Sequence, residues 1–392
     1  MRTPHRTMAV VALAAAVTTA FAAVLPAPLA SAVGPRDHRR LQAALERAVA
    51  AGAPGIVAQV QDGGGHWFGS AGLSDTATGR RRAPDERFRI GSTTKAFTAT
   101  VVLQLAAEHI LGLDDTVEKW LPGVVQGHGN DGRRITIRQL LDHTSGIFAY
   151  TNDPAFFAQG VGAAWFQHRF DHHSPQELVR IAMSHPPYFA PGQRFAYSNT
   201  DYVLAAMIVE RATGCSFATE LDRRIIRPLG LTGTSLPGDR ADVPDPHPVH
   251  YSTLFSSDPH PVVVDATEMN QSFAGAAGGV ISTTRDLTRF FTALLGGHLL
   301  PRREQAQLMT TVSTDGAGWI PNTRYGLGVF SQTLSCGVTV WGHGGATYGS
   351  WSYVMGSRDG RHLLTAQVNG DWSGLRVFDD LLTAEFCPAA SS

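Results

Sequence analysis

The alternation of apolar and polar residues predicts β-strands near both ends of the chain. Apolar residues alternate over 56–60 and again over 67–71, and the turn residues Asp62-Gly63-Gly64-Gly65 between them are typical of a hairpin. Towards the C-terminus, similar patterns predict strands at 325–330, 338–341, 352–356 and 363–368. Strands that follow one another through hairpins form an antiparallel sheet.

Helical patterns occupy the rest of the chain. Segments 36–50 and about 375–386 predict helices at the two ends, which we expect to pack on a face of the sheet. Phe97, Val101 and Leu105 recur at a helical spacing from Thr94 to His109. Further helices, joined by Pro- and Gly-rich loops, are predicted at 137–141, 175–183, 202–211 and 217–226. We therefore expect a mixed α/β (α+β) fold: an antiparallel β-sheet flanked by helices, with an inserted all-helical lobe.

The first 32 residues have the pattern of a secretory signal peptide. Arg2 and Arg6 precede an apolar run from Met8 to Val24, and the small residues Ala30-Ser31-Ala32 form a cleavage site. A membrane anchor needs about twenty apolar residues without such a site. We expect cleavage near Ala32, a secreted protein and no stable membrane anchor.

Composition limits the function classes that remain. The net charge is −1, charged residues make up 17% of the chain, and no basic cluster is present, so nucleic acid and anionic lipid are poor partners. No linker or repeat divides residues 33–392, which predicts one catalytic unit. Its sheet lobe is expected over about 33–110 and 262–392, and its helical lobe over about 111–261.

Three cysteines allow three disulfide pairings, and export permits a disulfide. Cys336 lies in a C-terminal strand pattern and Cys387 ends the last helix. We expect these two to pair and Cys215 to stay free.

Ser92 and Lys95 are the first candidates for chemistry. The chain has only two lysines, Lys95 and Lys119, against thirty arginines. An ammonium can lose its proton when it is desolvated, whereas a guanidinium cannot, so a lysine is required where a proton must be accepted. Ser92 stands where the predicted helix begins, one turn before Lys95, which places both on one face. The alternative is a serine at a helix start beside an exposed lysine.

A Tyr-x-Asn pattern occurs twice, as Tyr150-Thr151-Asn152 and as Tyr197-Ser198-Asn199. We prefer the later copy because a Pro191-Gly192 turn precedes it and a helix follows it. A tyrosine there can shuttle a proton if a nearby cation lowers its pKa, and Asn199 can bond Lys95 or a substrate carbonyl. The alternative is an Asx-type turn with a packed ring.

The segment Trp341-Gly342-His343-Gly344-Gly345-Ala346 follows a strand and is rich in glycine. Such a strand edge lets a substrate backbone approach and pair as an added strand. His343 would supply a donor or a positive field beside the nucleophile. The alternative is a hairpin turn with a solvated histidine.

In this order and combination, the three motifs resemble those of the serine penicillin-recognising enzymes of the class C β-lactamase-like branch, and most closely those of secreted D-alanyl-D-alanine carboxypeptidases. Further stretches carry the same resemblance: 88–95, 140–146, 191–192, 325–328, and 334–337 with the late Cys387. A Gly-x-Ser-x-Gly elbow is absent, which argues against an α/β-hydrolase.

The resemblance implies a β-lactamase/transpeptidase-like fold and acyl transfer through an acyl-enzyme on Ser92. Lys95 and Tyr197 would move the protons, and the backbone N–H groups of Ser92 and Ala346 would form the oxyanion hole. No metal or organic cofactor is implied. The expected substrate-binding residues are Asn199, His343, Gly344, Gly345, Ala346, Thr151 and Phe273.

The sequence also departs from the carboxypeptidase pattern. Those enzymes carry an arginine before the Ser-Cys-Gly segment and threonines around His-x-Gly, which grip the substrate's terminal carboxylate. Here these places are Phe330, Gly344 and Ala346. Loss of such a partner costs orders of magnitude in affinity. A peptidoglycan-derived peptide, an amide, an ester and a β-lactam all remain candidate substrates, and a penicillin-binding sensor without turnover remains the alternative to an enzyme.

Two weaker signals have structural interpretations. Five histidines could suggest a metal, but no carboxylate or cysteine stands at a recognised ligand spacing, so we expect loop histidines at 172, 173, 185, 247 and 250. The segment His143-Thr144-Ser145-Gly146 is expected to be a structural loop near the cleft, because its hydroxyls can satisfy turn amides.

Overall fold

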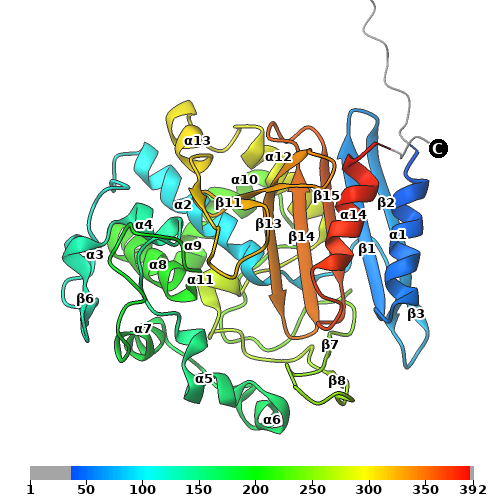
Figure 1. The fold of residues 1–392 in the computed structure, drawn as a ribbon, viewed down its shortest axis with the longest axis horizontal. Helices are drawn as coiled ribbons and strands as arrows, with labels where there is room; N and C mark the ends of the chain where they lie inside the picture. Colours follow the sequence, from blue (N-terminus) through cyan, green and yellow to red (C-terminus); the bar gives the residue numbers. More distant parts are fainter. Residues whose placement is uncertain (1–36, 389–392) are drawn as a thin grey trace, which may run out of the picture. The chain divides into compact units, whose positions relative to one another are not determined.

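The computed structural model of the protein describes residues 37–388, so the predicted signal peptide lies outside the described residues. A nine-stranded sheet forms its centre, in the order β10-β11-β12-β13-β14-β15-β1-β2-β3, with every neighbouring pair antiparallel (Figure 1). The predicted mixed fold with a large antiparallel sheet is confirmed. Its strands are β1 (Gly55–Asp62), β2 (Gly65–Asp75), β3 (Arg80–Arg81), β10 (Val312–Ser313), β11 (Thr323–Tyr325), β12 (Phe330–Thr333), β13 (Thr339–Thr347), β14 (Ser350–Gly356) and β15 (Leu363–Val368).

The two ends of the chain meet inside this sheet. β1 pairs with its hairpin partner β2 on one side and with β15 on the other, with Ile56 opposite Val368. This pairing joins the N-terminal hairpin and the C-terminal strands into one continuous sheet. Both β1 and β15 are largely buried. Residues 82–311 contribute no strand to this nine-stranded sheet.

Helices cover the two faces of the sheet. The terminal helices α1 (Arg39–Ala50) and α14 (Arg376–Phe386) pack together over one face, as expected, and share a core with Tyr353 and Met355 of β14 (Figure 1). Val354, which points the other way on the same strand, belongs to a second core with helix α12 (Thr284–Leu295). Helix α2 (Thr94–Ala107) runs through this second core, and eleven of its fourteen residues are buried.

The remaining helices lie between α2 and β10. They are α3 (Val117–Trp120), α4 (Ile137–Leu141), α5 (Pro154–Gln159), α6 (Trp165–His168), α7 (Pro175–Met183), α8 (Asn199–Thr213), α9 (Phe217–Leu221), α10 (Arg227–Leu229), α11 (Gly275–Gly278) and α13 (Arg302–Leu308). The largely helical part also contains two-residue strands, pairing as β5 (Gln126–Gly127) with β6 (Asn130–Asp131) and β7 (Tyr251–Ser252) with β8 (Val264–Asp265). A further pair, β4 (Phe88–Arg89) with β9 (Ile281–Ser282), precedes Ser92. Within 37–388, the helices lack the length and apolar character that crossing a bilayer demands.

One predicted strand is divided in the structure. Segment 325–330 contains a tight turn between β11 and β12, closed by a hydrogen bond from Gly326 N to Val329 O of 2.7 Å. Gly328 has φ of 77°, and a Cβ there would lie 2.4 Å from the Cβ of Ala99 and 2.9 Å from the carbonyl oxygen of Lys95. Glycine is therefore needed where this turn packs against the helix that carries Lys95.

The disulfide prediction is confirmed. Cys336 and Cys387 are bonded, with their Cα atoms 5.9 Å apart, and they join the β12–β13 turn to the end of α14. Cys215 is free and exposed.

Candidate active site

Ser92 lies on a single 3₁₀ turn, Gly91–Thr93, that leads directly into α2. Strand β13 passes very close to this turn. A Cβ at Gly345 would stand 2.0 Å from the carbonyl oxygen of Ile90 and 2.6 Å from the nitrogen of Ser92, and a Cβ at Gly91 would stand 2.7 Å from the backbone nitrogen of Ala346. Glycine at these two positions is what allows the strand to lie against the nucleophile.

Lys95 is fully buried and its amine has three oxygen neighbours. Nζ lies 3.2 Å from Ser92 Oγ, 2.7 Å from Asn199 Oδ1 and 2.7 Å from the carbonyl oxygen of Ala277. Burial holds the pKa of Lys95 well below its usual range, although the carboxyl of Asp201 opposes the shift. A neutral amine has two N–H donors and one lone pair. The amide and carbonyl oxygens take the two donors, so the lone pair faces the Ser92 hydroxyl.

Tyr197 approaches Ser92 from the other direction. Its hydroxyl donates to Ser92 Oγ at 2.7 Å, and its ring stacks on Trp319 with centroids 4.5 Å apart. The lowered pKa that was set as the condition for proton transfer by Tyr197 is not found, because burial, together with Asp201, raises the pKa of Tyr197, and the bond to Ser92 offsets only part of this. A neutral Lys95 supplies no positive charge to stabilise a phenolate. Tyr197 is therefore a neutral phenol that can relay a proton.

Asn199 is the first residue of α8, directly after the N-cap Ser198. Besides accepting from Lys95, its amide nitrogen donates to Thr151 Oγ1 at 3.4 Å. The earlier Tyr-x-Asn copy takes a different role: Tyr150 is fully buried and its hydroxyl donates to the carbonyl oxygen of Phe273. Of the two copies, the later one contacts Ser92 and Lys95.

His343 occupies a different position from the one expected. It lies within β13, fully buried, with Nδ1 donating to the carbonyl oxygen of Gly344 at 2.6 Å and Nε2 accepting from the Tyr325 hydroxyl at 2.9 Å. Burial lowers the pKa of His343 to about 3, so the ring is neutral. The positive field predicted for His343 is wrong. Its neighbours Gly344, Gly345 and Ala346 instead line the cleft.

Two cavities open beside the nucleophile and meet at Ala346. The first, of about 360 Å³, is lined in part by Thr151, Asn199 and Phe273, and it combines aromatic walls with the polar side chains of His168, Arg169, Asp171 and His173. The aromatic walls are supplied by Phe156, Phe157, Trp165, Phe255, Phe273 and Tyr348. The second, of about 270 Å³, contains Ser92 and Tyr197. Its remaining lining is Trp319, Ile320, Phe330, Gly344, Gly345, Ala346, Trp351, Ser352, Tyr353, Leu375 and Phe378, with no Arg, Lys or His among the described residues.

An unpaired strand edge connects the cavities. The ladder between β12 and β13 ends at Phe330 and Gly342, so beyond Gly342 strand β13 pairs with β14 alone in the described part of the chain. A substrate backbone can pair with this edge next to Ser92.

Several site residues were not identified from the sequence. The carbonyl of Ala277 comes from a Gly- and Ala-rich segment, 274–279, whose composition permits close packing and was the only signal. Trp319 comes from a glycine-containing loop and has no pattern of its own. Asp201 lies two residues after Asn199, in the first turn of α8. This position next to the Tyr-x-Asn motif was the signal that could have identified it.

Groups that could hold a metal lie away from Ser92. Among residues 37–388, His38, Asp62 and Glu385 form the one set of three ligand atoms close enough to share an ion, on α1, β1 and α14. Two of the histidines noted in the sequence have carboxylate partners: His172 contacts Asp239 at 2.6 Å and His185 contacts Asp153 at 2.8 Å. His250 is fully buried, and its ring nitrogens have no hydrogen-bond partner among the described residues.

Two solved structures that are similar to this chain are named as an amidohydrolase and an amidase. A D-stereospecific amidohydrolase from Streptomyces sp. is 48% identical, with a TM-score of 0.84, over 91% of this chain and all of that one. The D-amino acid amidase from Ochrobactrum anthropi SV3, solved with L-phenylalanine amide, is 26% identical, with a TM-score of 0.75, over 88% of this chain and 97% of that one.

Curated relatives match over shorter stretches. Penicillin-binding protein 4* of Bacillus subtilis is 30% identical over 277 residues, which are 65% of this chain and 56% of that protein. Esterase EstB of Burkholderia gladioli is 38% identical over 165 residues, 41% of each protein. The chain thus spans about half, or less, of the length of these relatives. The family pattern described as Beta-lactamase matches residues 41–379, and with the Ser-Lys-Tyr geometry above it shows that this chain belongs to the Beta-lactamase family of serine hydrolases and penicillin-binding proteins.

Proposed function

We propose that this protein hydrolyses amides or esters of D-amino acids whose leaving group is uncharged, through an acyl-enzyme on Ser92. The observation that carries the proposal is the second cavity, which contains Ser92 and Tyr197 and has aromatic and aliphatic walls without a cation. A substrate carboxylate placed there would lose its hydration without gaining a charged partner, which is costly. The 48% identical amidohydrolase supports the D-amino acid preference.

Acylation follows from the hydrogen bonds at Ser92. The lone pair of neutral Lys95 takes the Ser92 proton while Oγ attacks the substrate carbonyl carbon. The backbone N–H groups of Ser92 and Ala346 stabilise the oxyanion. The proton then passes from Lys95, by way of the Tyr197 hydroxyl, to the leaving nitrogen or oxygen. Water attacks the acyl-enzyme in the second step, with Lys95 again accepting the proton. The bond between the acyl carbon and Ser92 Oγ then breaks, the proton returns from Lys95 to Oγ, and the acid product leaves.

The proposed reaction indicates which part of the substrate each cavity would hold. The leaving group must lie within reach of the Tyr197 hydroxyl, so it occupies the cavity that contains Tyr197. The acyl side chain then occupies the aromatic cavity beside Asn199, of about 360 Å³. Aromatic walls favour an aromatic or large apolar side chain. D-Phenylalanine amide and D-phenylalanine esters are therefore the first substrates to test.

The D-Ala-D-Ala carboxypeptidase activity predicted from the sequence is the competing hypothesis. The two activities separate with one matched pair of substrates, N-acetyl-D-Ala-D-Ala and its C-terminal amide, which differ in the terminal charge. We expect kcat/KM for the amide to exceed that for the acid by at least about tenfold, because burying an unpaired charge is costly. Equal or faster cleavage of the acid would establish the carboxypeptidase instead.

Two controls complete the test. Ser92→Ala must abolish turnover of D-phenylalanine amide, and L-phenylalanine amide must be the poorer substrate of the enantiomeric pair. A burst without a steady state would identify a sensor that acylates and stalls. A fluorescent penicillin should label the parent enzyme slowly, because the β-lactam carboxylate also meets no cation in the second cavity. Ser92→Ala should remain unlabelled.

Export is a separate part of the proposal. The Cys336–Cys387 disulfide is consistent with an extracellular protein, and cleavage of 1–32 would release residues 33–392 as the catalytic unit. N-terminal sequencing of protein recovered from the culture medium tests this, with Val33 as the expected first residue.

A further inference from the structure

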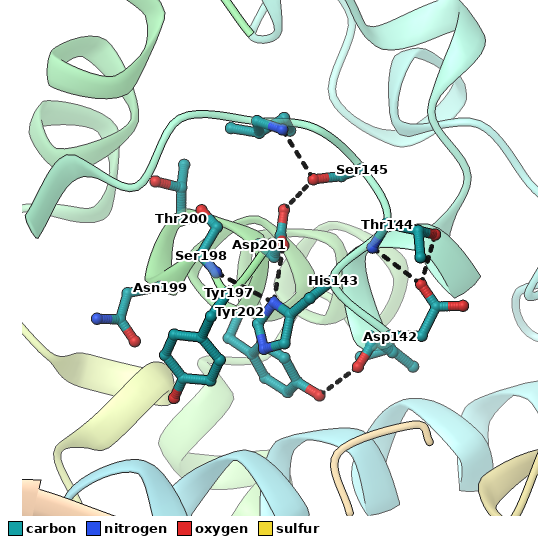
Figure 2. Close-up of polar contacts among 12 residues, drawn as sticks. Asp142, His143, Thr144, Ser145, Tyr197, Ser198, Asn199, Thr200, Asp201 and Tyr202 are labelled. Carbon is teal, nitrogen blue, oxygen red and sulfur yellow. Dashed lines mark hydrogen bonds and ion pairs between the residues drawn. The ribbon is translucent and has the colours of Figure 1, made fainter. Parts of the chain in front are cut away.

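A buried histidine and a buried carboxyl lie directly behind Tyr197. His143 Nδ1 is 2.9 Å from Asp201 Oδ2, and both side chains are fully shielded from solvent. The second carboxyl oxygen of Asp201 accepts from Ser145 Oγ at 2.6 Å. Figure 2 shows the imidazole of His143 beside the ring of Tyr197, with Asp201 above it on α8; the two ring centroids are 4.5 Å apart.

The pair is also bound to the backbone on both sides of Tyr197. The carbonyl oxygen of His143 accepts from Ala196 N at 2.9 Å. Figure 2 shows the second contact, between His143 Nδ1 and Ser198 N, which are 3.3 Å apart. His143 adopts φ of 59°, a left-handed conformation that is uncommon outside glycine but is adopted more often by Asn, Asp and His than by other residues. The loop therefore turns sharply at the point where it supports Tyr197.

The hydrogen bonds indicate where the proton of the pair resides. The Ser198 N–H lies 3.3 Å from Nδ1, and in the tautomer in which Nδ1 accepts this bond, the Asp201 oxygen 2.9 Å away carries a proton and donates it to the same nitrogen. Burial supports this assignment, since it raises the pKa of Asp201 well above and lowers the pKa of His143 well below their usual ranges. An uncharged pair leaves no anion to hold Lys95 in its protonated form.

We propose that His143 and Asp201 are positioning residues of the proton relay: as an uncharged hydrogen-bonded pair, they hold Tyr197 and Asn199 against Ser92 and Lys95. Tyr197 and Asn199 flank Ser198 in the sequence, and the N–H of Ser198 contacts His143. The Tyr197 hydroxyl contacts Ser92, and the Asn199 amide contacts Lys95. The inference rests on the proposed acyl transfer. Two alternatives exist. In the first, catalysis requires an ionised Asp201 carboxylate; in the second, the hydrogen bonds of His143 and Asp201 contribute only to the stability of the fold.

Two matched pairs of variants separate these alternatives. Asp201→Asn keeps a neutral donor towards Nδ1 and an acceptor for Ser145, whereas Asp201→Ala keeps neither. His143→Asn keeps an acceptor near the position of Nδ1 and tolerates positive φ, whereas His143→Ala removes the acceptor. Asp286→Ala is the control, because Asp286 is equally buried and accepts from Gly233 N at 2.7 Å and Thr234 Oγ1 at 2.9 Å, and neither partner lines a cavity.

The measurements are kcat and KM for D-phenylalanine amide and the melting temperature of each variant. A displaced catalytic group costs about 10²-fold in rate, so we expect both alanine variants at the pair to lower kcat by about that factor with KM little changed. Both asparagine variants should recover most of kcat. Asp286→Ala should lower the melting temperature and leave kcat near that of the parent.

Three results would overturn the proposal. Loss of kcat in Asp201→Asn as large as in Asp201→Ala would mean that an ionised carboxylate is required. Unchanged kcat in both alanine variants would mean that the pair positions nothing, and an equal loss in Asp286→Ala would mean that stability alone is responsible. Failure of the proposed function is recognised separately, because then the parent itself would not turn over the amide or Ser92→Ala would remain active.

Discussion

Replacing Lys95 by arginine tests the central step of the mechanism. In the structure the Lys95 amine lies 2.7 Å from Asn199 Oδ1, 2.7 Å from the carbonyl oxygen of Ala277 and 3.2 Å from Ser92 Oγ, so in its neutral form it can donate to the first two and point its lone pair at Ser92. A guanidinium has donors only and stays protonated, so it can satisfy both oxygens but cannot accept the Ser92 proton. The variant therefore keeps hydrogen-bond donors for these two oxygens and removes the base.

The expected loss is large. General-base catalysis contributes about 10²- to 10⁴-fold, or about 3 to 5 kcal/mol of barrier. We expect acylation by Lys95→Arg to slow by at least about 10²-fold at neutral pH, measured by stopped-flow release of p-nitroaniline from D-phenylalanine p-nitroanilide. Lys119→Arg is a matched control, since Lys119 is the other lysine, is 55% exposed and pairs with Asp115.

The pH dependence provides a second readout. Acylation requires neutral Lys95, so kcat/KM falls as the pH drops through the pKa of this amine. Burial holds this pKa well below that of an ordinary lysine, so activity should extend to correspondingly lower pH, and Lys95→Arg should lose this limb. Because Lys95 is buried, folding is checked by near-UV circular dichroism, and Lys95→Met provides a second variant without a base. If folded Lys95→Arg acylates as fast as the parent, the reasoning is wrong.

Three further predictions concern other parts of the molecule. Tyr197→Phe should lower kcat by about 10²-fold in the same assay while the ring keeps its contact with Trp319, and an unchanged kcat would exclude the relay. Phe273→Ala should raise KM for D-phenylalanine amide by about tenfold and leave KM for D-alanine amide similar, because it removes apolar wall from the first cavity; equal effects would contradict the assignment. Cys387→Ser should lower the free energy of unfolding in denaturant by about 4 kcal/mol, from a bridge with a sequence separation of 51, whereas Cys215→Ser should change it little.

The sequence alone was sufficient for much of the fold and for the reacting groups. Alternation of apolar residues predicted the strands at both ends of the chain, because successive side chains of a strand point to opposite faces and this pattern is read locally. The structure adds that β15 is buried at all of its positions. Ser92 and Lys95 share one turn of helix, so their spacing alone predicted their contact. The turn within 325–330 escaped prediction, because Gly328 is needed to pack against Ala99, far away in the sequence.

Only the tertiary structure decided the charge states and the shape of the cleft. His343 was expected to supply a donor or a positive field, and proton transfer by Tyr197 was made conditional on a lowered pKa, but burial by distant segments leaves both side chains neutral. The cavity beside Tyr197 brings together Trp319, Phe330 and Phe378, which no local pattern connects. The pKa of a side chain and the polarity of a cavity depend on neighbours contributed by the whole chain, whereas periodicity and spacing describe a few consecutive turns. For this reason the nucleophile and its base were evident from the sequence, and Phe330, Gly344 and Ala346 already indicated that a carboxylate partner is missing. The cavity without a cation, on which the proposed preference for an uncharged leaving group rests, emerged only from the folded chain.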